Sequence, residues 1–312
     1  MYFFSEEERK YLYRGLLPKA REMGVAEELR GWNWPQPPLA PIYDSVLALF
    51  EVAGAYCPTG RDLYLRRVAG VKTKPGPAML KGTVLHGALV HLLVAAKRII
   101  YTVGVDNHRQ IFALLDELPP YPPECWPAEA ASAAADDPES FARLRQNVQT
   151  LTDFEKARLA ARIQEILVRQ PHVGEDSLVS LAVPVVLEKK LDGTFLGLSA
   201  NLSTDAVTFP EPVIVDLKFG RPQPFHRLTT TGYALVMEAL FEFPVNLGCL
   251  VYAEFREDRL LIKRDLHIIS DELRQQFCEA RDEKARLVAE EIDPGVPESC
   301  PPGCPYGSVC RG

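Results

Sequence analysis

The fold is decided by residues 197–218, GLSANLSTDAVTFPEPVIVDLK, in which two strand patterns flank a proline-containing break. Side chains alternate between the two faces of a strand, and this alternation places Asp205 on the polar face of the first one. In the second strand it places Asp216 and Lys218 on the same face, about 7 Å apart at their Cα atoms. The stretch therefore predicts two successive strands whose charged side chains project together.

Paired carboxylates at this turn favour a metal site. If the two strands pair as neighbours, Asp205 approaches Asp216, and the two carboxylates repel each other unless a cation lies between them. Hard ions such as Mg²⁺ or Mn²⁺ suit an all-oxygen site. Lys218 supplies three donors that can orient a water or stabilise a developing oxyanion. The alternative interpretation is that all three are solvated polar positions on strands.

The bulk composition is that of an ordinary globular protein. The chain has 312 residues, of which 47% are hydrophobic and 25% charged, so it can bury a sizeable core. It has no run of about 18 uncharged apolar residues, and acidic residues near the N-terminus argue against a signal peptide. We therefore expect a cytoplasmic protein without membrane association. The formal net charge of −7 excludes a protein that coats nucleic acid indiscriminately.

One local stretch is nevertheless basic. Between residues 61 and 81 a single acid, Asp62, stands against six cations, which are Arg61, Arg66, Arg67, Lys72, Lys74 and Lys81. Such a patch can bind the phosphate backbone of a nucleic acid. We take the three arginines as DNA-binding candidates. A solvated helix and loop is the alternative interpretation.

The cysteines favour a metal cluster over disulfides. The chain has seven of them, an odd number, and three lie close together in the C-terminal tail as Cys300, Cys304 and Cys310. In a cytoplasmic chain, clustered thiols are typical of metal ligation. The tail is rich in Pro and Gly and has little apolar material with which to fold alone. The cysteine tail therefore needs another group to hold it in place.

A tetrahedral thiolate site takes four ligands, so the tail needs one more. Cys57, which ends an apolar run beginning at Ser45, is the best candidate. Cys249 lies in an apolar strand and Cys278 in a helix, and both positions suit core packing. Cys125 is the rival for the fourth place.

Periodicity predicts helices first and a sheet later. Helices are predicted over residues 5–31, 61–68, 81–101, 106–118, 137–170, 224–243 and 271–291, and strands over 178–189, 194–206, 213–219, 247–255 and 260–268. We expect one compact unit in which residues 1–175 are mainly helical, 176–292 form the sheet with its flanking helices, and 293–312 are the cysteine tail.

His86 borders the buried stripe of the helix over residues 81–101. A histidine in such a position is commonly a satisfied core residue. Its candidacy as a ligand depends on what faces it in the fold.

The order of these motifs resembles the RecB-like branch of the PD-(D/E)xK nucleases: a helix with GTVLHG, a strand ending in Asp, a strand with D-x-K and a helix with a G-Y-A core. One cysteine before the histidine and three at the C-terminus make the chain similar to the iron-sulfur CRISPR-associated exonuclease of the fourth Cas family. The segment YCPTGRDLYLRR looks like its longer archaeal subtype. The resemblance covers most of the chain from about Ser45 onward.

The resemblance implies an α/β fold with a central mixed sheet flanked by helices, a helical N-terminal and insert region, and an iron-sulfur tail. It implies that Mn²⁺ or Mg²⁺ is bound by His86, Asp205, Asp216 and the backbone carbonyl of Leu217. Lys218 completes the catalytic set, and Tyr233 supports it. The residues that match the four ligands of a 4Fe–4S cluster are Cys57, Cys300, Cys304 and Cys310.

Three departures from the family pattern stand out. Thr229 occupies the place of the glutamine that usually precedes Tyr233 by four residues, and Asp216 stands where Glu is frequent. The spacing from Cys300 to Cys304 is one residue longer than in a C-x-x-C pair. The first two leave room for a weak or inactive nuclease.

The resemblance implies a metal-dependent DNA nuclease that processes single-stranded ends or overhangs in CRISPR spacer acquisition, together with integrase subunits. The first alternative is a non-catalytic DNA-binding subunit of the integration complex, which grips DNA through the basic stretch. The second is a zinc protein, in which Cys57 and the tail hold Zn²⁺.

Overall fold

The computed structural model describes residues 1–130, 137–209, 211–256, 259–300 and 303–311. Its centre is a mixed five-stranded sheet in the order β1-β2-β3-β4-β5. The strands are β1 Val185–Leu191, β2 Leu202–Thr208, β3 Val213–Lys218, β4 Leu247–Arg256 and β5 Arg259–Ile268. Only β3 and β4 are parallel, because a helix separates them in sequence and returns the chain to the same end of the sheet. The expected α/β fold with a mixed sheet is confirmed.

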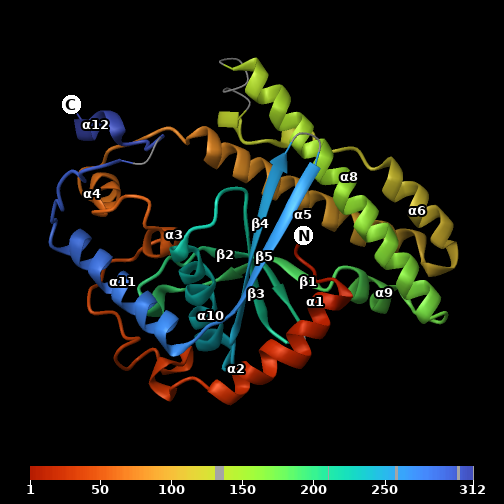
Figure 1. The fold of residues 1–312 in the computed structure, drawn as a ribbon, viewed down its shortest axis with the longest axis horizontal. Coiled ribbons are helices and arrows are strands. Elements are labelled where there is room, and N and C mark those ends of the chain that lie inside the picture. The colour runs from red at the N-terminus through yellow and green to blue at the C-terminus, as the bar shows by residue number, and fades with distance from the viewer. Residues whose placement is uncertain (131–136, 210, 257–258, 301–302, 312) are drawn as a thin grey trace.

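Helices cover both faces of this sheet (Figure 1). The α-helices are α1 Glu6–Tyr11, α2 Leu17–Met23, α3 Leu49–Ala53, α4 Arg61–Arg67, α5 Pro77–Val103, α6 His108–Glu117, α8 Pro138–Arg169, α9 Glu175–Ala182, α10 Arg227–Phe241, α11 Asp271–Ala289 and α12 Gly307–Arg311. A π-helical turn, Leu12–Leu16, joins α1 to α2. Short 3-10 turns are Glu27–Leu29, Gly31–Asn33, Val105–Asn107, Pro123–Cys125, Thr194–Leu196 and Pro224–His226.

Strand β3 is buried on both faces and separates two hydrophobic cores. The first lies on the side of α5, α8 and α9, and the second on the side of α3, α10 and α11. Val213, Val215 and Leu217 pack with apolar residues of α5, α8 and α9. Ile214, which points the opposite way, packs with residues of α3, α10 and α11. The alternation predicted for this strand is therefore confirmed. Its consequence is that the next residue on the Ile214 face, Asp216, is buried as well.

Helix α5 is the central helix of the first core. By length and composition alone it could cross a membrane. In this fold it packs against α6, α8 and α9. Leu85, Leu89 and Leu93 are buried in the core. Its apolar character therefore has an explanation within the fold.

The predicted strand over residues 178–189 is wrong in its first half. Residues Glu175–Ala182 form helix α9, and the strand begins only at Val185. Leu178, Val179 and Ala182 are buried at helical spacing, which resembles a strand pattern over so short a run. Pro184 separates the two elements.

The predicted strand over residues 194–206 also begins too early. Residues Thr194–Leu196 form a 3-10 turn, and Gly197 has φ of +70°. Leu198 makes an isolated parallel bridge with Leu47 instead of joining β2. Both Leu196 and Leu198 are buried, so their spacing reflects core packing of a loop.

The run from Ser45 to Cys57 is helical only over Leu49–Ala53. The long helix expected from Asp137 is confirmed as α8, where the Asp137 carboxylate accepts a hydrogen bond from the Ser140 N–H as the N-terminal cap. The hairpin of β4 and β5 is likewise confirmed.

Candidate active site

Asp205 and Asp216 lie at the point where β2 and β3 separate. The antiparallel ladder between these strands ends at the pair Ala206 and Val215. One step further along the same register, Asp205 stands opposite Asp216. Beyond the ladder, the backbone N–H of Leu217 donates to Oδ2 of Asp205 at 2.8 Å. The two strands thus pair across the short turn as predicted, and they bring both carboxylates to one place.

His86 reaches the same place from α5. Its Nδ1 lies 3.6 Å from Oδ2 of Asp205. Its ring meets the ring of Phe219 edge-on, with centroids 5.3 Å apart. The imidazole therefore faces a carboxylate, which is the condition on which its candidacy as a ligand depended.

Lys218 forms an ion pair with Asp216 two residues before it. Its Nζ lies 2.9 Å from Oδ2 and donates a hydrogen bond to Oδ1 at 3.3 Å. Asp216 is buried, and its Oδ2 accepts no hydrogen bond despite that short ion-pair distance. This oxygen is therefore paired in charge with the Lys218 ammonium, although it accepts no hydrogen bond of good geometry.

The candidate site carries more negative than positive charge, which favours binding of a cation. Burial raises the pKa of Asp216, Lys218 opposes that shift, and the charge of Asp205 adds to it. For Lys218, burial acts to lower the pKa, but Asp216 and Asp205 outweigh it and the pKa is raised. Two acids share one ammonium, so a divalent ion would neutralise the excess negative charge.

The residues fit a hard divalent ion by their chemistry. An imidazole, two carboxylates and the backbone of Leu217 come together, which is a nitrogen and oxygen donor set suited to Mn²⁺ or Mg²⁺. Across the described ranges, no group of three or more His, Cys, Asp and Glu side chains is arranged to hold a metal ion. Lys218 and the Leu217 N–H occupy the carboxylates, and these would turn from their present partners to bind one.

Sequence reasoning missed Tyr2, which inserts beside His86. Its side chain is 1% exposed, and its hydroxyl lies 3.1 Å from Nδ1 of His86. Burial, with Asp205 and Asp216 nearby, raises the pKa of Tyr2. Nothing in the sequence around Tyr2 signals this contact.

The N-terminal residues that carry Tyr2 are held by charged groups of the core. The Met1 ammonium pairs with the buried carboxylate of Glu155 on α8. Arg264 donates to the Met1 carbonyl at 3.0 Å, and Arg158 donates to the Phe3 carbonyl at 3.1 Å.

A second missed residue, His226, is buried at the start of α10. Its Nε2 lies 3.0 Å from the Tyr56 hydroxyl, and its Nδ1 lies 3.2 Å from the Tyr252 hydroxyl. Burial, and then the charge of Lys218, lowers the pKa of His226 to about 4. A neutral histidine therefore links the loop before Cys57 to the neighbourhood of Lys218.

Tyr233 lies in α10 and contacts the strand that carries Asp205. Its hydroxyl donates to the Ser203 carbonyl at 2.6 Å. Burial, with Asp216 and Asp205, raises the pKa of Tyr233. The Tyr233 hydroxyl thus bonds to β2 beside the carboxylates, and their negative charges contribute to its raised pKa.

The three arginines of α4 pair with acids of the same chain. Arg61 binds Asp293 through two hydrogen bonds of 2.8 and 2.9 Å. Arg66 and Arg67 both contact Glu51, at 3.1 and 2.5 Å. Two carboxylates thus pair with three guanidinium groups, which reduces the positive charge that these arginines can offer a phosphate chain.

The cysteine tail packs against α4 and the loop of Cys57. The Thr59 hydroxyl donates to the Gly295 carbonyl at 2.9 Å, and Cys57 Sγ lies 3.7 Å from that hydroxyl. Arg66 donates to the Tyr306 hydroxyl at 3.2 Å. The pKa of Arg61 is raised mainly by Asp293, and contact with Cys310 contributes.

The thiols fall into two groups. The candidate ligands are partly exposed and none is in a disulfide; they are Cys57, Cys300, Cys304 and Cys310. Cys249 and Cys278 are buried, as predicted, and burial raises their pKa to about 12 and about 11. Cys125 is exposed and adjoins Trp126, which packs on Phe141 of α8. Four accessible thiols on two joined segments fit a thiolate cluster by donor type.

The sequence matches, over residues 1–312, the family described as CRISPR-associated exonuclease Csa1. A curated relative of that name from Saccharolobus solfataricus is 30% identical over 312 residues, which is 99% of each chain. Another from Thermoproteus tenax is 31% identical over 288 residues, or 92% of each chain.

Proposed function

The chain belongs to the family of the CRISPR-associated exonuclease Csa1, and on this premise we propose that it is a metal-dependent deoxyribonuclease. We propose that it trims single-stranded ends or overhangs of DNA during CRISPR spacer acquisition. The sheet with its flanking helices would then be a RecB-like PD-(D/E)xK core.

One observation carries this proposal: His86, from a helix far earlier in the sequence, meets Asp205 of β2, which stands opposite Asp216 of β3 next to the ammonium of Lys218. Strand pairing accounts for Asp205 facing Asp216, so the approach of His86 from α5 is what distinguishes this site from solvated strand positions.

His86, Asp205, Asp216 and the Leu217 carbonyl would hold Mn²⁺ or Mg²⁺. The chemistry that such an ion supplies when bound is neutralisation of the scissile phosphate and a lowered pKa of a bound water. Lys218 would orient that water or stabilise the oxyanion, since its side chain is 29% exposed and its charge is maintained by two carboxylates. The hydrogen bond from Tyr233 to the Ser203 carbonyl would hold the backbone of β2 in place during the reaction.

We further propose that Cys57, Cys300, Cys304 and Cys310 bind a 4Fe–4S cluster that fixes the tail to α4. The contacts of Thr59 with Gly295 and of Arg66 with Tyr306 support this role, because they hold the two cysteine-bearing segments together. Integrase subunits of the adaptation machinery are the proposed protein partners, and the cytoplasm is the proposed compartment.

The deciding experiment compares the wild type with Asp205→Ala on a labelled single-stranded oligonucleotide in Mn²⁺. We expect the variant to lose cleavage while an anaerobic preparation keeps the brown colour of an iron-sulfur protein. Glu254→Ala, which removes an exposed carboxylate of β4 outside the site, is the matched control and should cleave normally. Cleavage that survives Asp205→Ala would mean that the active site lies elsewhere.

Thr229, in place of the motif glutamine, favours a second candidate function, a non-catalytic DNA-binding subunit. Wild-type protein that binds DNA but cleaves none with any divalent ion would establish it. A colourless protein with one zinc per chain would instead favour the zinc protein.

A further inference from the structure

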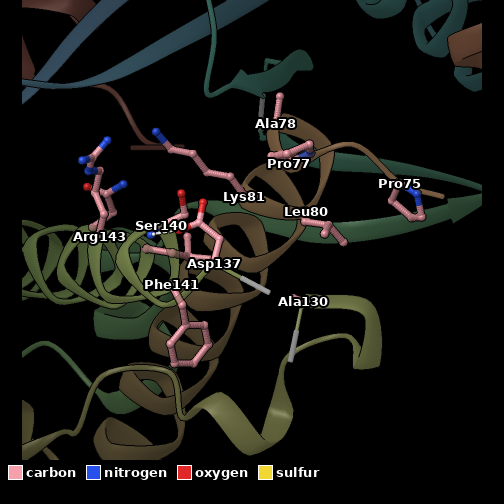
Figure 2. A pocket seen from close by; sticks show the side chains of 12 residues that line it. Pro75, Pro77, Ala78, Leu80, Lys81, Ala130, Asp137, Ser140, Phe141 and Arg143 are labelled. Atoms are coloured by element: carbon pink, nitrogen blue, oxygen red, sulfur yellow. Dashed lines mark hydrogen bonds between the residues drawn. The ribbon is translucent and has the colours of Figure 1, made fainter. Parts of the chain in front are cut away.

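A cavity of about 400 Å³ lies between the first turns of α5 and α8 (Figure 2). Its size falls within the range of about 300–1,000 Å³ that is typical of small-ligand sites. Its walls are mainly apolar, with Leu80 from α5 and Phe141 and Leu144 from α8. The volume and the apolar walls of the cavity would therefore admit a group of nucleobase size.

Two cations stand at this cavity, Lys81 from α5 and Arg143 from α8. Figure 2 shows both side chains reaching out on the same side. Burial, and then the charge of Arg143, lowers the pKa of Lys81. Two cations on the wall of one cavity favour an anion as ligand.

Little in the described chain neutralises this pair. No described carboxylate forms an ion pair with Lys81, whose Nζ lies 5.3 Å from the ring centroid of Phe255. Arg143 has an exposed partner in the same helix, Glu139, and pairs of that kind are weak. Asp137 also lines the cavity, but its carboxylate caps α8 by accepting from the Ser140 N–H.

Aromatic rings connect this cavity to the candidate active site. The ring of Phe255, under Lys81, stacks on Phe219 with centroids 6.3 Å apart and 21° between planes. Phe219 in turn meets the His86 ring at 5.3 Å. Both phenylalanines are partly exposed, so their rings form a partly accessible apolar path between His86 and Lys81.

We propose that this cavity binds one nucleotide of a single-stranded DNA whose end lies in the candidate active site, with a phosphate between Lys81 and Arg143 and the base against the apolar wall. This rests on the proposed nuclease function. Single strands are bound by cationic grooves combined with apolar or aromatic surfaces on which bases pack. A duplex keeps its bases stacked inside, so only an unpaired nucleotide offers both groups to the cavity.

The test is binding of a fluorescent oligothymidylate to Lys81→Ala/Arg143→Ala, measured by anisotropy without divalent ions at several salt concentrations. We expect binding to weaken about eightfold at 50 mM salt, since the contribution of one phosphate contact to single-strand binding scales as the salt concentration to the power of about −0.7. The slope of log affinity against log salt should become shallower by about 0.7 for one lost phosphate contact. Arg145→Ala is the matched control, because it removes an exposed cation of α8 outside the cavity.

Lys81→Met keeps the apolar stem over Phe255 and covers the case in which the double variant does not fold. Cleavage assays in Mn²⁺, with one long and one very short oligonucleotide as substrates, distinguish a failure of the cavity proposal from a failure of the nuclease proposal. A wild type that cleaves, with cavity variants that bind and cleave long DNA as it does, overturns the cavity proposal and leaves the nuclease standing. A wild type that binds through the cavity and cleaves nothing overturns the nuclease and supports the cavity.

Discussion

The hydroxyl of Tyr2 lies 3.1 Å from Nδ1 of His86, so a side chain from the start of the chain contacts the helix that supplies the imidazole of the candidate site. The same nitrogen is 3.6 Å from Oδ2 of Asp205. Histidines that bind metals are normally oriented by a hydrogen bond at the other ring nitrogen, and such partners contribute to affinity. Because Tyr2 and Asp205 both lie at Nδ1, Tyr2 serves in that way for a metal bound at Nε2 of His86.

Tyr2→Phe is therefore expected to weaken Mn²⁺ binding by about tenfold while the fold stays intact, since outer contacts of this kind are worth about 10- to 100-fold. The measurement is calorimetric titration of the protein with Mn²⁺, with the Mn²⁺ dependence of cleavage as a second readout. Tyr11→Phe removes the hydroxyl of an exposed tyrosine and should change neither. An unaltered Mn²⁺ affinity in Tyr2→Phe would show that the contact only fills space.

The part of the site that the sequence predicts is the part built by local geometry. Asp216 and Lys218 share a face because side chains alternate along a strand, and Asp205 joins them because a short turn makes β2 and β3 neighbours. The approach of His86 and Tyr2 depends on how α5 and the N-terminus pack on the sheet. Periodicity carries no information about that packing.

The same limit explains the arginines of α4. Within residues 61–81 their charges look unopposed, because their partners Glu51 and Asp293 lie outside that stretch. Helix α9 was missed for a different reason: a helix of eight residues with a short buried run resembles a buried strand. Element type is thus predictable for long periodic segments, while pairings between distant segments need the fold.

Cys57→Ala should give a colourless protein after anaerobic purification, with iron and sulfide content falling together, because a cluster loses one of its four ligands. Cys125→Ser, which changes the exposed rival thiol, should stay brown. Cys249→Ala should also stay brown, although it loses stability, because that thiol is buried in the core. A brown Cys57→Ala together with a colourless Cys125→Ser would reassign the fourth ligand.

His226 should make the protein sensitive to mild acid. Its pKa is about 4 in the folded chain against 6.5 for an ordinary histidine, because it is buried and near Lys218. The unfolded chain therefore takes up a proton first as the pH falls, so the contribution of His226 to stability is complete above pH 6.5 and is lost as the pH approaches 4.

Between pH 7.5 and 5, the wild type should accordingly lose about 2 kcal/mol more of its unfolding free energy than His226→Gln. Urea denaturation at the two pH values measures this difference. His108→Gln, at an exposed position of α6, should lose as much as the wild type. Equal losses in all three proteins would mean that His226 is protonated in the folded state.

Glu238 of α10 stabilises the part of the core on the α10 side of β3 through ion pairs. Its removal should lower the unfolding free energy substantially. Its carboxylate, fully buried, accepts from Arg274 at 2.7 and 2.9 Å and from Arg30 at 2.8 Å. Glu238→Gln would leave these guanidinium charges buried without a counter-ion, so the unfolding free energy should fall by about 3–5 kcal/mol. Glu283→Gln, which breaks an exposed pair with Arg286, should lower it by about 1 kcal/mol or less. Urea unfolding of both variants distinguishes them, and similar small losses would mean that water reaches the arginines when the carboxylate is gone.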